Sequence, residues 1–479
     1  MLFLLISCLV RPSIFTTDVS DPRHNIVQER ILAIDWDAVE KEASLRLQEY
    51  IRVDTTNPPG TELQGAEYLA RILEEEGIES TILLSAENRG NLIAKLPGKG
   101  IEKPLCLLSH IDTVTYEAEK WTHHPLSGHL DEEGYIWGRG ALDMKSMGIM
   151  ELMSLILLKR QQVALDRDII LIAVSDEEDG GTGMQFLVDH HWDQLNCGAL
   201  INEGGLGLKG AIFPKQNMYP ISVGEKGNIW FRMVAKGDSG HGSTPRPNEA
   251  SEKLLKAIAK IQASPIHTNI HPVLGQFLAN VGAQKGGVMS FIMRQPFFRT
   301  LLVKPKLEKN PLTKAAMMNT VHLTGFGGFN RPNVVASEVF AQFDCRILPG
   351  VEPNAFLDNL KKIAGRDVSF DIITSRSGNE STMDNPVYRA LARYAVAGEE
   401  GAVAGPVISV GFTDSIYVRP KGTHAYGFVP ILLDAEEMNG FHGVNERISE
   451  ENIGIGTKKL YSAILEVVSS SNTTYEIGH

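Results

Sequence analysis

Hydrophobic positions between Trp36 and about Ser222 follow two alternating spacings. Residues 37–53 and 65–77 place apolar side chains three and four positions apart, which predicts amphipathic helices. Residues 104–112, 167–178 and 198–205 are short apolar runs that end in polar residues, as buried strands do. This alternation predicts an α/β domain with a mostly parallel central sheet flanked by helices. Ligands bind at the carboxyl ends of the strands in such sheets, so the polar residues there are candidates for a site.

The pattern changes near Gly224. Residues 227–237 and 338–348 alternate apolar and polar side chains with period two, which is typical of half-exposed antiparallel strands. Residues 249–262, between them, have the spacing of an amphipathic helix. We therefore expect residues 222–378 to form an α+β lid domain inserted into the catalytic domain, which residues 35–221 and 379–479 would form.

One stretch of the insert combines apolar and basic side chains. It is FIMRQPFFRTLLVKPKLEK, residues 291–309. We expect it to pack within the inserted domain. A lid over an apolar substrate tail and a membrane-facing patch are the alternatives.

Length and charge narrow the class of protein. A chain of 479 residues is long for one domain, and its 43% hydrophobic and 22% charged content is ordinary for a globular protein. The net charge of −12 argues against nucleic acid as the main partner, because a phosphate backbone needs a concentrated basic surface. The balance is compatible with a cation site, since clustered carboxylates contribute to it.

The cysteines and the N-terminal residues bear on the compartment. The four cysteines (Cys8, Cys106, Cys197 and Cys345) lie far apart without a C-x-x-C pair, so we expect buried free thiols rather than disulfides or a thiolate zinc site. The start, MLFLLISCLV, is apolar but about half the length of a membrane helix. We expect residues 1–34 to lie outside the fold, as a signal-like segment or a disordered tail. Because LISC resembles a lipoprotein cleavage site, export or membrane anchoring is favoured over a cytoplasmic location.

Four strand ends and one C-terminal loop carry potential metal ligands. They are His110 and Asp112 in SHIDTV, Asp143 in GRGALDMK, Glu177 and Glu178 in SDEEDGG, Glu203 in INEGG and His442 in GFHGVNERI. Any one alone would be an ordinary structural residue, but their common placement after strands of one sheet predicts a shared site. Imidazole and carboxylate suit zinc, and several carboxylates can hold two ions. Asp112 would accept the second N–H of His110. One of two adjacent glutamates can bind metal while the other acts as a base.

These motifs together resemble the co-catalytic di-zinc hydrolases that include aminoacylase, acetylornithine deacetylase, succinyl-diaminopimelate desuccinylase and carboxypeptidase G (peptidase clan MH). The matching stretches are residues 109–145, SDEEDGGTGM, INEGG, GHGSTP, RPNVV, GFTDS and HGVNE, in the family's order. The resemblance implies a zinc-peptidase-like catalytic domain with an inserted lid domain.

The resemblance also implies roles for individual residues. Two Zn²⁺ ions, or Co²⁺ or Mn²⁺ in their place, would share Asp143; His110 and Glu203 would complete one ligand set, and Glu178 and His442 the other. Glu177 would be the general acid–base, and His241 in GHGSTP would donate a hydrogen bond to the oxyanion. Asp112, which would orient His110, is counted with them as a catalytic residue. Asn333, Arg346 and Thr413 would bind substrate.

Departures from the family pattern bear on the substrate. Many members carry, after TDS, an arginine that holds the substrate carboxylate; here the residue is Ile416, and Arg419 or Arg346 could replace it. Phe412 stands where glycine is common, which would narrow the pocket. Glu203, which is Asp in some members, favours deacylases.

We therefore expect a hydrolase that cleaves N-acyl amino acids with metal-activated water. A carboxypeptidase or dipeptidase acting on small peptides is the alternative. Family members also occur as homodimers through the lid domain, and the extra stretch in this insert leaves monomer or dimer open.

Overall fold

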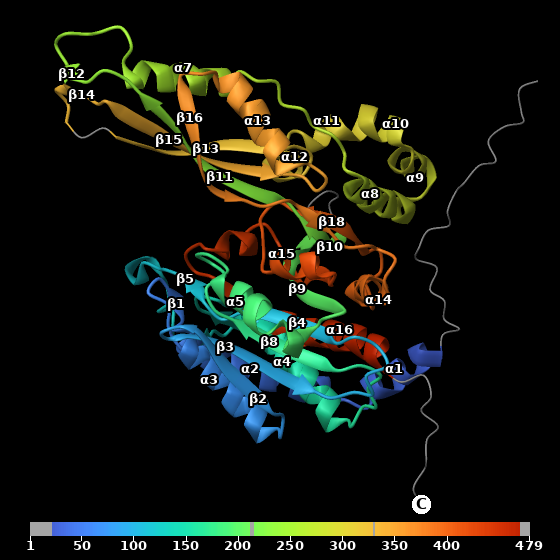
Figure 1. Cartoon of the computed structure of the whole chain (residues 1–479). Helices are drawn as coiled ribbons and strands as arrows, with labels where there is room; N and C mark the ends of the chain where they lie inside the picture. Colours follow the sequence, from blue (N-terminus) through green and yellow to red (C-terminus); the bar gives the residue numbers. More distant parts are fainter. Residues whose placement is uncertain (1–21, 211–214, 329–330, 470–479) are drawn as a thin grey trace, which may run out of the picture.

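The computed structural model describes residues 22–210, 215–328 and 331–469 (Figure 1). The main sheet has the strand order β17-β10-β19-β9-β4-β8-β3-β2, with β18 beside β10. Its strands are β2 (Ser80–Ala86), β3 (Arg89–Leu96), β4 (Leu105–His110), β8 (Ile169–Val174), β9 (Ala199–Lys209), β10 (Asn217–Glu225), β17 (Asn379–Glu380), β18 (Val403–Ser409) and β19 (His424–Leu433). The central strands β8, β4, β9 and β19 run parallel, as predicted, while β3 and β10 join them antiparallel.

Helices cover both faces of this sheet because its central strands are apolar on both sides. In β4, Leu105 and Leu107 pack in the core beneath α2, α4 and α16, whereas Cys106 and Leu108 pack in the core beneath α5. The helices of the first face are α2 (Trp36–Arg52), α3 (Glu62–Glu75), α4 (Lys145–Arg160), α14 (Pro386–Ala395) and α16 (Glu450–Val468); the second face carries α5 (Thr182–His190), α6 (Trp192–Leu195) and α15 (Ser415–Val418). Every residue of α4 from Lys145 to Leu158 is buried, as expected for a helix enclosed between sheet and outer helices.

Small strands frame the edge of the sheet where the loops gather. β1 (Thr56–Asn57) pairs in parallel with β5 (Thr113–Val114), and β7 (Tyr135–Trp137) pairs antiparallel with both β6 (His129–Leu130) and β20 (Arg447–Ser449). These pairs tie the loop after β4 and the loop before α4 to distant parts of the chain.

The fold begins earlier than the sequence predicted. Helix α1 (Pro22–Leu32) falls within the segment expected to lie outside the fold, yet Val27 and Ile31 are buried in the catalytic core. Arg30 Nη1 donates a hydrogen bond to the carbonyl of Gln161 at 3.0 Å, after α4. Isolated apolar residues near a terminus do not reveal the surface that they cover. Residues 1–21, with the signal-like stretch and Cys8, lie outside the described residues.

The expectation of free thiols is wrong for two cysteines. Cys106 and Cys197 form a disulfide, with Cα atoms 5.8 Å apart, whereas Cys345 is free and buried. The two residues are 91 positions apart in sequence, but Cys197 lies two residues before the start of β9, which pairs with β4 at Cys106. Spacing along the chain cannot show this proximity, because the sheet creates it.

The inserted domain is built on a four-stranded antiparallel sheet. Its order is β13-β15-β11-β16, formed by β11 (Gly227–Lys236), β13 (Thr320–Gly327), β15 (Glu338–Ile347) and β16 (Val368–Ser375). Burial in β15 alternates residue by residue, and the buried side packs on α7 (Ala250–Gln262) and α13 (Pro353–Ala364). The antiparallel pairing of β11 with β15 matches the prediction from period two.

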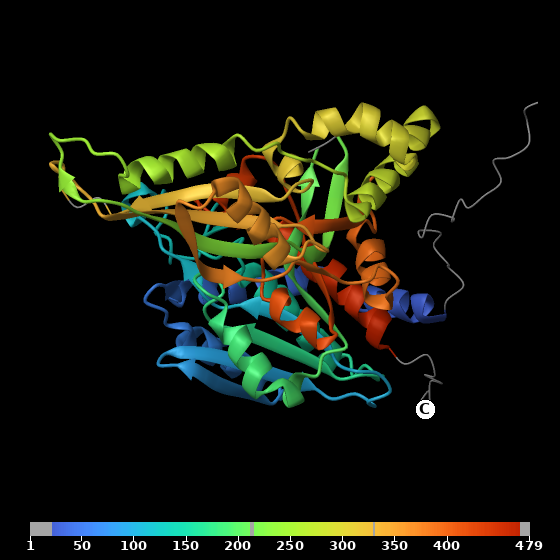
Figure 2. The same ribbon diagram turned by 45° about the horizontal axis from the view of Figure 1, so that its top comes forward.

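Part of the stretch 291–309, which was expected to pack within the inserted domain, packs on the catalytic sheet instead, because Met293 shares a core with Met218 and Val403. Helix α8 (Pro272–Lys285) contributes Phe277 and Val281 to a core with Met218 of β10 and Val403 of β18, both in the catalytic sheet. The helices from α8 to α12 (Pro311–Ala315) lie at the opposite end of the insert from β12 (Gly240–His241) (Figures 1 and 2). In the described part of the chain, no helix combines the length and hydrophobicity needed to cross a membrane.

Candidate metal centre

The parallel register of the central sheet brings two of the predicted ligand loops together. His110 is the last residue of β4 and pairs with Val174, the last residue of β8, so the loop from Ser175 to Glu178 begins beside it. Two ligands do not follow strands of the main sheet as predicted. Glu203 lies within the neighbouring strand β9, which continues to Lys209, and Asp143 stands between β7, a strand of the separate three-stranded sheet, and the amino end of α4. His442 lies in the loop before β20.

Five predicted ligands form two groups that share one residue. His110, Asp143 and Glu203 make the first group, and Asp143, Glu178 and His442 the second; within each group the ligand atoms lie within 4.8 Å of one another. His110 Nε2 is 3.1 Å from Asp143 Oδ1, and His442 Nε2 is 3.1 Å from Asp143 Oδ2. Each oxygen of Asp143 therefore faces a different histidine, which is the arrangement a bridging carboxylate requires.

The backbone orients His110 for metal binding. Its Nδ1 lies 2.9 Å from the carbonyl oxygen of Asp112, so Nδ1 carries the proton and Nε2 presents its lone pair. The sequence predicted that the Asp112 carboxylate would accept this proton. That prediction is wrong, because Asp112 Oδ1 lies 3.7 Å from Nδ1. It accepts instead the backbone N–H groups of Glu177 at 3.0 Å and Glu178 at 3.1 Å.

The charged loop SDEEDGG is held by groups that the sequence did not single out. Asp176 has a left-handed φ of 65°, which turns the chain sharply before the two glutamates. Its carboxylate accepts a hydrogen bond from Asn57 at 2.9 Å and lies 3.1 Å from the guanidinium of Arg89. Asn57 also donates to Asp112 at 2.9 Å. This network holds the backbone from which Glu177 and Glu178 extend, and no spacing rule in the sequence indicates it.

Glu446 performs a similar task for the bridging loop. This fully buried residue of HGVNE accepts backbone N–H groups of Leu142 at 2.6 Å and Asp143 at 3.0 Å with Oε1. Its Oε2 accepts Arg139 Nη1 at 2.7 Å and the N–H of Gly140 at 3.1 Å. The motif that supplies His442 thus also fixes the position of Asp143.

Negative charge is crowded in the site, and the crowding favours cations. Burial and the Asp143 carboxylate raise the pKa of Glu203 to about 8. Burial also raises the pKa of Glu177 well above its ordinary value, with Glu203 as the next cause. Hydrogen bonds to Asp143 and Glu178 raise the pKa of His442 to about 10. Without metal, these side chains hold protons that offset the crowded negative charge. Two divalent cations would neutralise the same carboxylates.

The residues present fit a pair of divalent metal ions. Each group offers one imidazole nitrogen and two carboxylates, which is a three-ligand set that leaves a position open for water. Glu178 Oε1 is buried without a hydrogen-bond partner among the described residues, an unsatisfied state that a cation would relieve. Glu177 belongs to neither group, so its carboxyl stays free to exchange a proton.

The GFTDS segment closes another side of the site. The backbone N–H of Thr413 donates to Glu225 Oε2 at 2.7 Å. Asp414 is buried, and its Oδ1 has no hydrogen-bond partner among the described residues. Burial raises the pKa of Asp414 to about 8. Its negative charge contributes to the raised pKa of both Glu177 and Glu203. Asp414 is a further site residue that the sequence did not single out.

The two arginines suggested as carboxylate anchors differ in their availability. The Arg419 guanidinium is buried and bonded to Glu225, Asn379 and the carbonyl of Ala425. Arg346 of β15 pairs with Asp344, lies 5.5 Å from the ring centroid of Phe412 and keeps Nη1 buried without a hydrogen-bond partner among the described residues. Of the two, Arg346 has a donor to spare.

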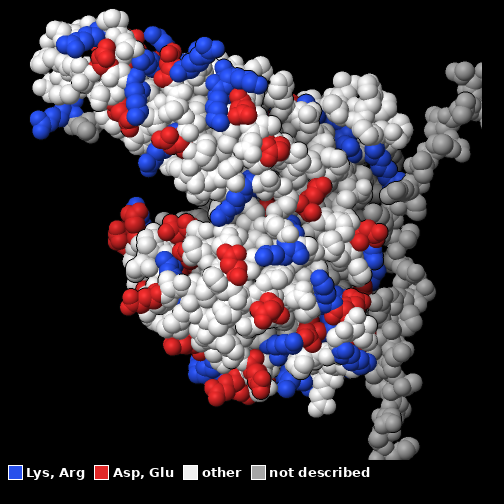
Figure 3. All heavy atoms as spheres, in the orientation of Figure 1, with Lys and Arg blue, Asp and Glu red and all other residues white. Residues whose placement is uncertain are grey.

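His241 and Asn333 lie near each other, but the structure does not place them at the metal-ligand groups. β12 (Gly240–His241) pairs with β14 (Val334–Val335), and the N–H of Gly242 donates to the carbonyl of Asn333 at 2.9 Å. Both residues are exposed, beyond the far end of β11, a strand of 10 residues that starts at the hinge with the catalytic domain. Ten residues of strand span about 33 Å. Figure 3 shows an open hollow between this end of the insert and the catalytic domain.

Two adjoining groups that could each hold a metal ion, with an unligated carboxylate beside them, are typical of a metal-dependent hydrolase. The chain belongs to peptidase family M20/M25/M40, whose family model matches residues 106–466. It is accordingly an enzyme that cleaves amide or peptide bonds.

Known proteins of two activities resemble the chain. N-fatty-acyl-amino acid synthase/hydrolase PM20D1 from Homo sapiens is 30% identical over 389 residues, covering 78% of this chain and 75% of that protein. Probable carboxypeptidase S-like 2 from Dictyostelium discoideum is 28% identical over 368 residues, covering 74% and 70%. The crystal structure of Sso-CP2, an M20 family metallo-carboxypeptidase from Sulfolobus solfataricus, superposes with a TM-score of 0.68 at 18% identity, covering 89% of this chain and 99% of that one. This last likeness confirms the fold with its inserted domain.

Proposed function

We propose that the protein hydrolyses the amide bond of N-acyl amino acids, with two zinc ions bound by the two ligand groups. The observation that carries the proposal is the bridging geometry of Asp143, with Glu177 next to it and outside both groups. The name of the human relative adds support, because it describes a hydrolase of N-fatty-acyl amino acids.

The chemistry divides between the ligands and the residues around them. Divalent cations at such a centre lower the pKa of water and polarise a carbonyl oxygen. Glu177 accepts the proton of the attacking water and returns it to the leaving amine. Burial raises the pKa of the Glu177 carboxyl, which makes it a stronger base than an exposed glutamate.

Arg346 is our candidate for holding the substrate carboxylate. Its Nη1 has no hydrogen-bond partner among the described residues, and its guanidinium carbon lies 5.5 Å from the ring centroid of Phe412, the residue before Thr413 and Asp414. Since Ile416 is apolar and Arg419 is engaged with Glu225, Arg346 supplies the cation that a free α-carboxylate needs. Replacing it by methionine should raise KM for N-acyl amino acids about 10-fold or more, and leave KM for their carboxamide analogues nearly unchanged.

His241 reaches the site only after a rearrangement, in this proposal. It would donate a hydrogen bond to the oxyanion when the inserted domain closes, or when the insert of a second chain covers the site. Mixing His241→Ala with Glu177→Ala distinguishes the two routes. Recovered turnover in the mixture indicates contribution from a second chain, whereas two inactive variants that stay inactive together indicate closure within one chain.

A carboxypeptidase activity is the second candidate, because an N-acyl amino acid and a peptide share the same C-terminal carboxylate and the same amide. The relative from Dictyostelium discoideum is named as a probable carboxypeptidase. A panel of N-acyl amino acids and unblocked dipeptides, assayed with zinc and after chelation, tests the proposal. Higher kcat/KM for the acylated compounds supports it, and higher kcat/KM for the dipeptides refutes it.

A further inference from the structure

Residues 287–315 form a small group of helices, here named the helical lobe. It consists of α9 (Gly287–Arg294), α10 (Pro296–Phe298), a π-helical turn (Arg299–Val303), α11 (Lys304–Leu307) and α12 (Pro311–Ala315). Of the twenty large apolar side chains that are exposed on the described residues, seven belong to this lobe: Val288, Met289, Phe291, Phe297, Leu301, Leu302 and Leu312. Single exposed apolar residues are ordinary, but a concentration of them marks an interaction surface.

The lobe is folded and anchored on its inner side, so these residues are not a core left open. Met293 packs with Phe277 of α8 against the catalytic sheet, and Leu307 packs with Leu278. Arg299 Nη1 fixes the turn by donating to the carbonyl oxygens of Gly275 at 2.8 Å and Met293 at 3.1 Å. The outward apolar face is thus held rigidly by the rest of the protein.

Three aromatic rings of the lobe contact one another, and two of them are exposed. Phe298 lies 5.3 Å from Phe291 and 5.3 Å from Phe297, measured between ring centroids. Phe297 is 70% exposed and Leu301 is 59% exposed. Large apolar side chains presented in this way enter the boundary between lipid headgroups and acyl chains.

The charge of the lobe is opposite to that of the protein. It carries six basic residues and one acidic residue, while the whole chain has a net charge of −12. Arg294, Lys306 and Lys309 are exposed, and the single acid, Glu308, lies 3.7 Å from Lys304. In Figure 3 the upper right of the molecule, where the lobe lies in Figure 1, is mostly uncharged, with basic side chains near its margin. An apolar surface with basic side chains near its margin is complementary to an apolar layer that has negative charge at its boundary.

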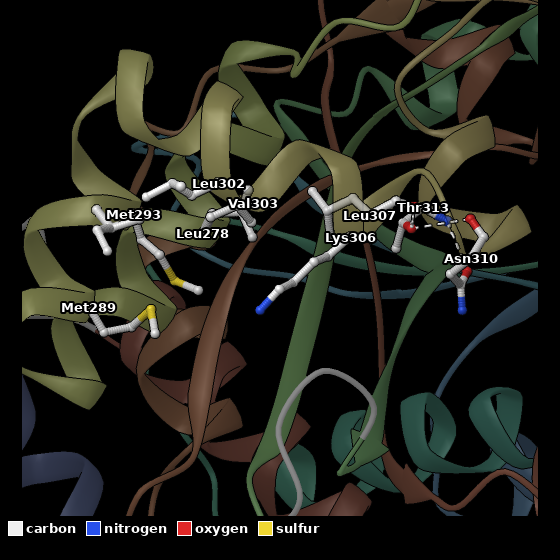
Figure 4. A pocket seen from close by; sticks show the side chains of 10 residues that line it. Leu278, Met289, Met293, Leu302, Val303, Lys306, Leu307, Asn310 and Thr313 are labelled. Atoms are coloured by element: carbon white, nitrogen blue, oxygen red, sulfur yellow. Dashed lines mark hydrogen bonds between the residues drawn. The ribbon is translucent and has the colours of Figure 1, made fainter.

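An apolar cavity of about 350 Å³ opens within the same lobe. Met289, Met293, Leu302 and Val303 line one part of it, and Lys306 extends alongside them (Figure 4). The cavity gives an acyl chain a place to enter beneath the outward face, with a cation beside it.

We propose that the helical lobe docks the protein on the surface of an anionic lipid bilayer. Phe297 and Leu301 insert among the acyl chains, and Arg294, Lys306 and Lys309 contact the headgroups. A second copy of this chain fits less well, because a two-fold contact would place the basic residues of one lobe against those of the other. The proposal is independent of the substrate.

Vesicle flotation with the full chain tests the docking. Binding to phosphatidylcholine vesicles should increase when phosphatidylglycerol is included, and should fall as salt is added. The double variant Phe297→Ser, Leu301→Ser should lower the apparent affinity for vesicles about 10-fold or more, because it removes two apolar side chains that insert into the bilayer. Lys306→Glu with Lys309→Glu should cause a similar loss on the anionic vesicles only.

Matched control variants lie on the opposite end of the insert. Leu255→Ser on α7, where the side chain is 62% exposed, and Lys236→Glu on β11, where it is 75% exposed, should bind vesicles as the unaltered protein does. Unchanged hydrolysis of a water-soluble substrate shows that the lobe variants are folded. Equal vesicle binding by the Phe297→Ser, Leu301→Ser variant and the unaltered protein overturns the proposal. The proposal is also overturned if light scattering shows that the unaltered protein is a dimer without lipid and that the Phe297→Ser, Leu301→Ser variant is a monomer.

Discussion

Glu446 offers a sharp test of how the bridging loop is held. In Glu446→Gln the side chain keeps its shape, but one acceptor oxygen becomes an NH₂ group. Oε1 faces the N–H groups of Leu142 and Asp143, and Oε2 faces Arg139 and the N–H of Gly140. Whichever way the amide turns, its NH₂ group takes the place of an oxygen that accepted two hydrogen bonds. Both bonds are lost, and the NH₂ group faces the two donors that made them.

The expected cost follows from the burial of the pair. The Arg139 side chain is 3% exposed and that of Glu446 is fully buried, so the substitution leaves a buried cation without its counter-charge. Breaking such a pair costs about 3–5 kcal/mol. The loop that carries Asp143 also loses its support, and loss of a supporting partner of this kind weakens metal binding about 10–100-fold.

Urea unfolding and metal titration measure these two effects. The control is Glu436→Gln, since Glu436 also pairs with an arginine, Arg447 at 3.3 Å, but its side chain is 82% exposed. The control should have the free energy of unfolding and metal affinity of the unaltered protein. If Glu446→Gln matched the control in both, the assigned role of Glu446 would be wrong.

Three further predictions address the metal centre, a distant ion pair and the disulfide. Asp143→Asn should lose both metal ions and His442→Ala only one, measured as the metal-to-protein ratio, because Asp143 alone belongs to both groups; equal losses would contradict bridging. Hydrogen bonds from Lys459 and Tyr219 hold the pKa of Glu399 below its usual value despite burial, so its stabilisation is present above about pH 4.5 and is lost as pH falls through the lowered pKa. Glu399→Gln should therefore be less stable than the unaltered protein at pH 7, by about 1 kcal/mol, with the difference shrinking below pH 4.5; a pH-independent difference would refute this. Peptide mapping without reductant should recover Cys106 joined to Cys197, and finding both as free thiols would contradict the disulfide.

The sequence predicted those parts of the fold and site that follow from periodicity and from strand ends. Period two identified β11 and β15, and apolar runs identified β4 and β8 with the ligands at or just after their ends. The run that identified β9 placed its end too early, because the strand continues to Lys209 and Glu203 lies inside it. The residues that support the site were missed, because Arg89, Asn57 and Glu446 act through contacts with loops far away in the chain. The same reason explains the Cys106–Cys197 disulfide. The placement of α8 on the catalytic sheet was also missed, since an apolar helix face does not state which surface it covers.

The role of Glu177 is the central claim, and one paired measurement tests it most directly. Glu177→Gln and Asp179→Asn each remove one charge from the same loop, but Asp179 is exposed. Metal content and kcat on an N-acyl amino acid should be measured together. The account predicts that both variants keep two metal ions per chain, and that only Glu177→Gln loses turnover, by about 10²–10⁴-fold. Near-normal turnover in Glu177→Gln, or loss of metal along with turnover, would contradict it.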